Sequence, residues 1–293
     1  MTQSRLFCFG LGYTAEALAR RLVGEGWQAA GTCRDEKRQA ELRAVGIEAW
    51  LFDRDRPLEE LDTCLAGTTH LLSSVPPDDV GDPVIDVHGP ALARLAGLAW
   101  IGYLSTTGVY GDRDGGWVDE ESELRPTGKR GRRRVAAEAA WMELWRRRGL
   151  PVHLFRLAGI YGPGRSALEN LARDRAQRID KPGQVFSRIH VDDIATTLNA
   201  SMRHPHAGAI YNVCDDDPAP PAEVVAYAAD LLGVPPPPLV PFAEARLSEM
   251  ALSFYDDNKR VSNALIKREL GVELAFPDYR QGLQSILKSR SGR

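Results

Sequence analysis

The chain has 293 residues, with 37 Lys or Arg against 40 Asp or Glu, and its formal net charge at pH 7 is −3. A charge so nearly balanced predicts no general binding to nucleic acid or to an anionic membrane surface, and no apolar run approaches the roughly 18 residues of a membrane span. The length fits two domains or one large α/β domain with a lobe. Four widely separated cysteines favour a reducing cytoplasm and argue against a disulfide framework or a zinc site.

The first predicted element is a short apolar strand from Arg5 to Phe9, which stops at two glycines and is followed by a helical pattern. Gly10 permits a tight turn from strand to helix, Gly12 lets the backbone approach a pyrophosphate, and Ala15 is small enough for the helix to pack on its strand. The N–H groups of the helix start favour phosphate. The pattern therefore predicts a dinucleotide site, with an ordinary turn as the alternative, built from Gly10, Gly12, Tyr13, Thr14 and Ala15.

Strand and helix patterns alternate along the following 150 residues. This alternation is typical of a doubly wound α/β fold, in which helices cover both faces of a parallel sheet. The next strands are predicted at 27–32, 48–52, 69–73, 100–104 and 152–156. Helices are predicted at about 35–44, 85–95, 133–147 and 222–232.

Charged residues follow the second and third predicted strands, where parallel sheets bind their ligands. Arg34 comes directly after the second strand and suits the 2′-phosphate of NADP(H), whereas the next residue, Asp35, suits the ribose hydroxyl of NAD(H). The order favours NADP(H) and leaves NAD(H) possible. Alternatively, both residues only open a charged helix, with Asp35 as its N-cap. Asp53, after the third strand, either accepts from an adenine amino group or caps a turn.

Four later segments occur in a fixed order: Leu-Ser-Thr-Thr-Gly-Val-Tyr-Gly at 104–111, Arg-Leu-Ala-Gly-Ile-Tyr-Gly-Pro-Gly at 156–164, Arg-Ile-His-Val-Asp-Asp-Ile at 188–194 and Tyr-Asn-Val-Cys at 211–214. Together with the glycine loop, they resemble the extended short-chain dehydrogenase/reductase family, which comprises NAD(P)-dependent epimerases and dehydratases of nucleotide sugars. The resemblance implies a Rossmann-type domain over residues 1–158 and 188–214. It also implies a smaller substrate-binding lobe over 159–187 and 215–293.

The resemblance implies roles for residues in the matching segments. Thr106 would touch the reacting oxygen, and Asp192 would cap the helix after the third segment. Ser74, Val75 and Pro76 would lie against the ribose and nicotinamide of the cofactor. Four residues near the substrate would be Tyr110, Tyr161, Arg165 and His190, with packing as the alternative for the tyrosines and the histidine. Relatives often form homodimers.

One departure from the family concerns the catalytic Tyr-x-x-x-Lys motif. When Glu138 is aligned with the glutamate that commonly follows this motif, Arg130 takes the place of the tyrosine and Arg134 that of the lysine, and no tyrosine occurs between Asp112 and Pro151. A positioned acid or base contributes about 10²–10⁴-fold to a rate, so its loss impairs the ordinary mechanism. Arg130 is too basic to donate protons, but it could hold an anionic substrate or stabilise an alkoxide. Arg134 could replace the lysine at the nicotinamide ribose.

The basic run at 129–134 is expected at the mouth of the active site, where it would meet a phosphate or carboxylate. The sequence thus predicts an atypical NAD(P)-dependent oxidoreductase or epimerase. Its substrate would be a nucleotide-linked compound such as a nucleotide sugar, or a small anion, and no metal is expected. The alternative is an inactive sensor or scaffold protein that keeps the cofactor pocket.

Overall fold

A computed structural model describes residues 4–95 and 97–291. At its centre is a seven-stranded sheet of order β11-β7-β5-β4-β1-β2-β3, in which every neighbouring pair is parallel. The strands are β1 (Arg5–Phe9), β2 (Gln28–Cys33), β3 (Glu48–Leu51), β4 (His70–Ser73), β5 (Trp100–Thr106), β7 (Val152–Leu157) and β11 (Ile210–Val213). From β1 the successive strands β2 and β3 are added toward one edge of the sheet, and from β4 the later strands are added toward the other edge, so the strand order reverses between β1 and β4. Doubly wound folds bind ligands beyond the carboxyl ends of the strands at such a point. The predicted fold class is confirmed.

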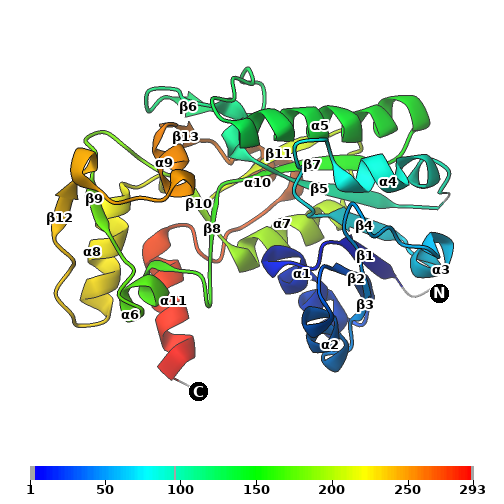
Figure 1. The fold of residues 1–293 in the computed structure, drawn as a ribbon, viewed down its shortest axis with the longest axis horizontal. Helices are drawn as coiled ribbons and strands as arrows, with labels where there is room; N and C mark the ends of the chain where they lie inside the picture. Colours follow the sequence, from blue (N-terminus) through cyan, green and yellow to red (C-terminus); the bar gives the residue numbers. More distant parts are fainter. Residues whose placement is uncertain (1–3, 96, 292–293) are drawn as a thin grey trace.

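Helices cover both faces of the sheet (Figure 1). One face packs against α1 (Tyr13–Gly24), α2 (Glu36–Ala44), α7 (Val191–Arg203) and α10 (Ala264–Leu270), and the other against α3 (Leu61–Leu65), α4 (Pro83–Leu92) and α5 (Lys129–Arg148). Strand β1 contributes apolar side chains to both faces of the sheet, because Leu6 and Cys8 belong to one core cluster and Phe7 and Phe9 belong to the other. All four are fully buried, as expected for a central parallel strand.

A smaller lobe lies at one end of the sheet, on the left in Figure 1. It contains β8 (Gly159–Tyr161), α6 (Ala167–Ala172), β9 (Arg178–Asp180), β10 (Arg188–His190), α8 (Pro221–Leu231), β12 (Leu239–Pro241), η2 (Phe242–Glu244), α9 (Glu249–Tyr255) and α11 (Tyr279–Ser291). Leu168, Ala228 and Leu283 belong to the core that joins α6, α8 and α11. Between the lobe and the sheet lie η1 (Thr107–Tyr110) and the strand pair β6 (Trp117–Val118) and β13 (Arg260–Val261). In the described ranges, no helix combines the length and apolar character needed to cross a membrane.

In three helices, the first residue is determined by the side chain that caps the N-terminus. Helix α4 begins at Pro83, earlier than predicted, because the Asp82 carboxylate accepts from the N–H groups of the first turn. Asp35 caps α2, the alternative given for it in the sequence, with its Oδ1 2.8 Å from the Arg38 nitrogen. The prediction that Asp192 caps α7 is wrong. Strand β10 runs directly into the helix, so His190 is the N-cap and its Nδ1 accepts from the Asp192 nitrogen at 3.2 Å.

Candidate active site

The glycine loop between β1 and α1 is tight and lies against the segment that follows β4. Gly10 has φ +84°, a conformation that favours glycine, and a Cβ there would come within 3.1 Å of side-chain atoms of Ser74 and Val75. The Gly10 nitrogen donates to Thr32 Oγ1 at 2.9 Å, and the Ser74 hydroxyl donates to the Gly10 carbonyl. These contacts bring the predicted cofactor residues Gly10, Ser74 and Val75 together.

The start of α1 is open. Gly12 is its N-cap, no side chain caps the helix, and a Cβ on Gly12 would meet no atom within 4 Å. The N–H groups of Tyr13, Thr14 and Ala15 lack acceptors within the helix because they belong to its first turn. An open cradle of backbone donors at the positive end of a 12-residue helix fits the diphosphate of a dinucleotide.

The charged residues after β2 and β3 differ in whether their side chains already have partners within the protein. The Asp35 carboxylate is used to cap α2, and Asp53 accepts from the Asp55 nitrogen at 3.1 Å and from Arg56 at 3.0 Å. Both carboxylates therefore have the structural roles that were the alternatives in the sequence. The Arg34 side chain is exposed, and no ion pair involves it within the described part of the chain.

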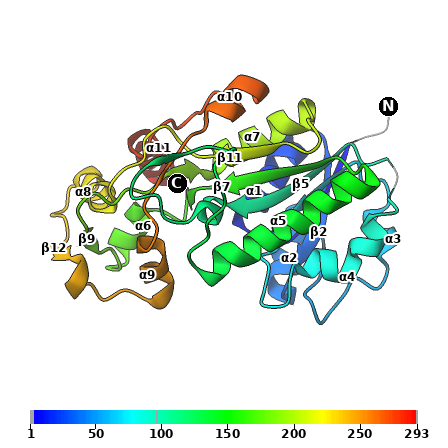
Figure 2. The ribbon, with the colours of Figure 1, turned by 90° about the horizontal axis from the view of Figure 1, so that it is seen from above.

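A cleft of about 810 Å³ lies beside the carboxyl ends of β4 and β5. Its walls come from residues 76–77 after β4, from Thr106 and Gly108, from the start of α5, and from α9 with Asp257 after it. Figure 2 shows α9 beyond the N-terminal end of α5. The cleft brings together four of the predicted site residues: Thr106, Arg130, Arg134 and Pro76.

Thr106 ends β5 and is half-buried. Its Oγ1 accepts a hydrogen bond from the Gly108 nitrogen at 3.1 Å. Because the hydroxyl oxygen serves as the acceptor there, its own proton stays available to a molecule in the cleft.

The basic residues at the start of α5 fall into two groups. Arg134 donates to the Tyr103 hydroxyl at 3.1 Å and to the Leu104 carbonyl, so its guanidinium is fixed against β5. Arg133 pairs with Asp79. Lys129 and Arg130 are exposed, and the described residues offer neither of them an ion pair.

The tyrosines that could replace the missing acid are not placed for this role. Tyr103 and Tyr110 are fully buried, and neither belongs to the cleft lining. Tyr110 accepts from Arg156 at 2.9 Å and donates to Asn212 at 2.7 Å. Burial raises the pKa of Tyr103, and it raises the pKa of Tyr110 to about 12. A useful general acid needs a pKa near the working pH, so these environments act in the wrong direction.

Tyr161 and His190 pack against each other and not against the cleft. Their rings meet edge to face with centroids 5.2 Å apart, and the His190 ring lies 4.1 Å from that of Phe276. The Tyr161 hydroxyl donates to the Asp278 carbonyl at 3.3 Å, and burial raises the pKa of its phenol. Both residues thus have the packing role that was the alternative in the sequence.

Arg165 lies beside the glycine loop. Its Cζ is 5.9 Å from the centroid of the Tyr13 ring, and Tyr13 is the first residue of α1. The Tyr13 hydroxyl donates to the Pro163 carbonyl at 3.0 Å, and a Cβ on Gly162 would come within 2.4 Å of that hydroxyl. The turn that carries Arg165 is therefore fitted closely to the start of α1, outside the lining of the cleft.

Two further cleft residues were not predicted from the sequence: Met250 and Phe254 of α9, which are 54% and 58% exposed. Their spacing of four places them on one face of a helix, but nothing in the sequence states which surface that face meets. Lys129 belonged to the predicted basic run and does line the cleft.

Comparisons with known proteins agree with this fold. The model of the NAD dependent epimerase/dehydratase family matches residues 10–214. Protein YeeZ of Escherichia coli K12 is 30% identical over 284 residues, which cover 92% of this chain and 95% of that protein. A solved structure described as a functionally unknown conserved protein from Silicibacter pomeroyi is 51% identical, has a TM-score of 0.90 and covers 98% of this chain and 99% of its own. The fold is shared with a dTDP-glucose 4,6-dehydratase from Bacillus anthracis in complex with NAD. That structure is 16% identical, has a TM-score of 0.80, and the match covers 99% of this chain and 97% of that chain.

Proposed function

The chain belongs to the NAD dependent epimerase/dehydratase family, and from that premise we propose that it is an NAD(P)-dependent enzyme of oxidoreductase or epimerase type acting on a small anionic substrate. The observation that carries the proposal is the continuity of two sites. Val75 lies against Gly10 of the glycine loop, and the next residue, Pro76, lines the cleft together with Thr106 and unpaired cations. A dinucleotide held by the loop would thus reach the cleft through this segment.

We propose different residues for the diphosphate and for the nicotinamide end of the dinucleotide. The amides of Tyr13, Thr14 and Ala15 would bind the diphosphate, and Ser74 and the residues after it would border the nicotinamide end. When bound, the nicotinamide accepts or supplies a hydride.

At the adenosine end, the free Arg34 supports a preference for NADP(H), because Asp35 and Asp53 are engaged in local turns. Its guanidinium suits a 2′-phosphate. NAD(H) remains the alternative cofactor, and substitution of Arg34 separates the two.

We also assign Arg165 to the diphosphate and not to the substrate. It stacks beside Tyr13 at the start of α1 and lies outside the cleft lining. Charge-assisted hydrogen bonds to phosphate are among the strong ones in proteins.

Three side chains of the cleft are proposed to act on the substrate. Thr106 would donate to the reacting oxygen, and Arg130 would hold the anionic group. Arg134, fixed by Tyr103 and the β5 backbone, would stabilise negative charge that develops nearby. The described residues that line the cleft include no tyrosine, histidine or cysteine, and of its two carboxylates Asp257 is paired with Lys259, which leaves Glu249. We propose that the main contribution of the protein is binding and charge stabilisation.

An inactive cofactor-binding sensor or scaffold is the second candidate, and the absence of a tyrosine from α5 favours it. Measurement of NADPH and NADH oxidation over carbonyl compounds, unsaturated acids and nucleotide sugars separates the two functions. Turnover that Arg134→Gln lowers at least tenfold, with cofactor affinity retained, supports the enzyme. Tight cofactor binding without turnover, combined with affinity for a protein partner that changes with the redox state of the cofactor, would replace the enzyme by the sensor. The homodimer is carried over from the family as a proposal that light scattering tests.

A further inference from the structure

We infer that the cleft binds an anionic group joined to a flat apolar body, such as an aryl carboxylate or aryl phosphate, in preference to a nucleotide sugar. The inference rests on the proposed function, because it specifies the substrate of the same cleft. It is drawn from three properties of the lining: an apolar wall, unpaired cations and few uncharged polar side chains. Two carboxylates, Glu249 and Asp257, also belong to the lining, and Asp257 is paired with Lys259.

The apolar wall comes from α9. Met250 and Phe254 occupy one face of this helix, line the cleft and are each more than half exposed. Exposed apolar side chains that gather at a concave surface are typical of a ligand-binding groove, since a ligand that covers them removes apolar surface from water. Pro76 and Pro77 add further apolar lining. Such a surface suits a flat hydrocarbon body.

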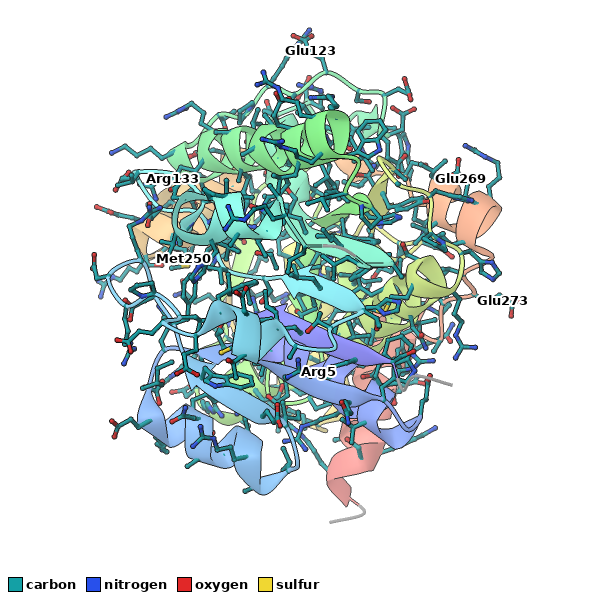
Figure 3. The ribbon with its side chains drawn as sticks, turned by 90° about the vertical axis from the view of Figure 1, so that its right-hand side faces the viewer. Arg5, Glu123, Arg133, Met250, Glu269 and Glu273 are labelled. Atoms are coloured by element: carbon teal, nitrogen blue, oxygen red, sulfur yellow. The ribbon has the colours of Figure 1, made fainter. Side chains whose placement is uncertain are left out.

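The cations lie at the start of α5. Lys129 and Arg130 stand in the first helical turn, which contains no acidic residue, and Gly128 provides no side-chain cap. The positive end of a helix disfavours cations and favours anions. Neither side chain is in an ion pair with another described residue, in contrast to Arg133, which pairs with Asp79. An anionic ligand would neutralise both cations and the helix end together. Figure 3 shows Arg133 and Met250 on the same flank of the molecule.

The uncharged polar side chains of the cleft are few, and two of their three hydroxyl groups already donate within the protein. Thr127 donates to Asp257 at 2.6 Å, and the Ser253 hydroxyl donates to the Met250 carbonyl at 2.8 Å. Thr106 accepts from the Gly108 nitrogen, and the described lining contains no Asn or Gln. A nucleotide sugar would bring several hydroxyls into this cleft and find few uncharged partners for them, which weakens binding.

Calorimetric titration of the chain, with and without NADP⁺, tests the inference with four probes: 2-naphthoate, 2-naphthyl phosphate, the neutral 2-naphthamide and UDP-glucose. We expect at least one naphthyl anion to bind tenfold or more tightly than both the amide and UDP-glucose. The comparison of carboxylate with phosphate identifies which anion the cations prefer. The inference is overturned if UDP-glucose binds more tightly than both naphthyl anions, if amide and anions bind alike, or if neither anion binds at millimolar concentration.

Matched variants locate the binding. Phe254→Ser should weaken the naphthyl probes at least fivefold, whereas Leu252→Ser, an exposed position of the same helix outside the cleft lining, should not. The double variant Lys129→Gln/Arg130→Gln should weaken the anions tenfold and leave the amide unchanged, and Arg146→Gln at the other end of α5 is the control. Equal effects of the cleft variants and their controls would contradict the inference. If no dinucleotide binds, the proposed function fails, and the titrations of the unloaded chain still decide the nature of the cleft.

Discussion

Arg156 of β7 and Glu138 of α5 form a buried ion pair, in which Nη2 lies 2.8 Å from Oε2 and the side chains are 3% and 5% exposed. Ser105 donates to the same carboxylate, and Arg156 also donates to Tyr110. The pair joins the middle of α5 to the sheet. It therefore fixes the helix whose first turns carry the basic residues of the cleft.

Removal of one partner of this pair should destabilise the fold strongly. Arg156→Met or Glu138→Gln leaves a buried charge without its partner, which costs about 3–5 kcal/mol. The double variant Arg156→Met/Glu138→Gln removes both charges and should cost clearly less than the two single changes added together. Urea denaturation measures the free energy of unfolding for each. A loss below about 1 kcal/mol in both single variants would show that the pair does not hold α5 to the sheet.

The sequence was sufficient to predict six of the seven strands, because most of them are apolar runs and the glycine loop has a fixed spacing, whereas β11 was not predicted as a strand. Residues in β1 alternate between two cores, a pattern that requires a central strand. Helix ends were less predictable, since they depend on which side chain meets the free N–H groups. His190 could cap α7 only because β10 leads into the helix without a loop.

The candidate site was predictable where one local segment builds it and not where distant segments meet. The glycine loop and Thr106 belong to the first kind. The wall made by Met250 and Phe254 belongs to the second, because a seven-residue helix more than a hundred residues from α5 is placed by tertiary packing. Tyr110 appears in a matching segment, yet the bonds to Arg156 and Asn212 turn its hydroxyl into the core.

Gly12→Val should abolish tight binding of NADPH and NADH without loss of stability. The backbone at Gly12 has φ −83°, which any residue adopts, and a Cβ there points into open space. The side chain would occupy the cradle in which the diphosphate is proposed to lie. We expect an affinity at least tenfold lower and an unchanged melting temperature. Gly24→Ala, at the last residue of the same helix, also meets open space and serves as the control. Native affinity in Gly12→Val would exclude this loop as the site of the dinucleotide.

Arg34→Glu should change the choice between the two cofactors. The side chain is exposed and unpaired in the described structure, so its replacement removes no ion pair of the fold. A repulsive carboxylate near a 2′-phosphate should lower NADPH affinity at least tenfold and leave NADH affinity the same or higher. Fluorescence titration with each cofactor gives the ratio, and Lys37→Glu, an exposed position in α2, controls for net charge. An unchanged ratio would remove Arg34 from the site.

Arg165→Gln should weaken NADPH and NADH equally, because the proposed diphosphate contact is common to both. We expect a loss of about tenfold in affinity and a weaker dependence of affinity on salt concentration. Arg175→Gln, an exposed arginine of the same lobe with no ion pair among the described residues, is the matched variant. A change in substrate KM with cofactor affinity retained would return Arg165 to the substrate side.

Asp215→Asn should remove part of the pH dependence of stability. Asp215 is 1% exposed, and burial raises the pKa of its carboxyl to about 8, against the attraction of Arg188 and of nearby backbone N–H groups. The folded chain therefore keeps this proton up to about pH 8, whereas the unfolded chain releases it near 3.8. The resulting stabilisation is complete below pH 3.8 and is lost as the pH rises to about 8, with an upper bound of about 6 kcal/mol. Denaturation at several pH values should show the native chain losing stability relative to Asp215→Asn across this window. The control is Asp217→Asn, which removes a half-exposed carboxylate paired with Arg280. If the difference in the free energy of unfolding between the native chain and Asp215→Asn stays constant with pH, the raised pKa is contradicted.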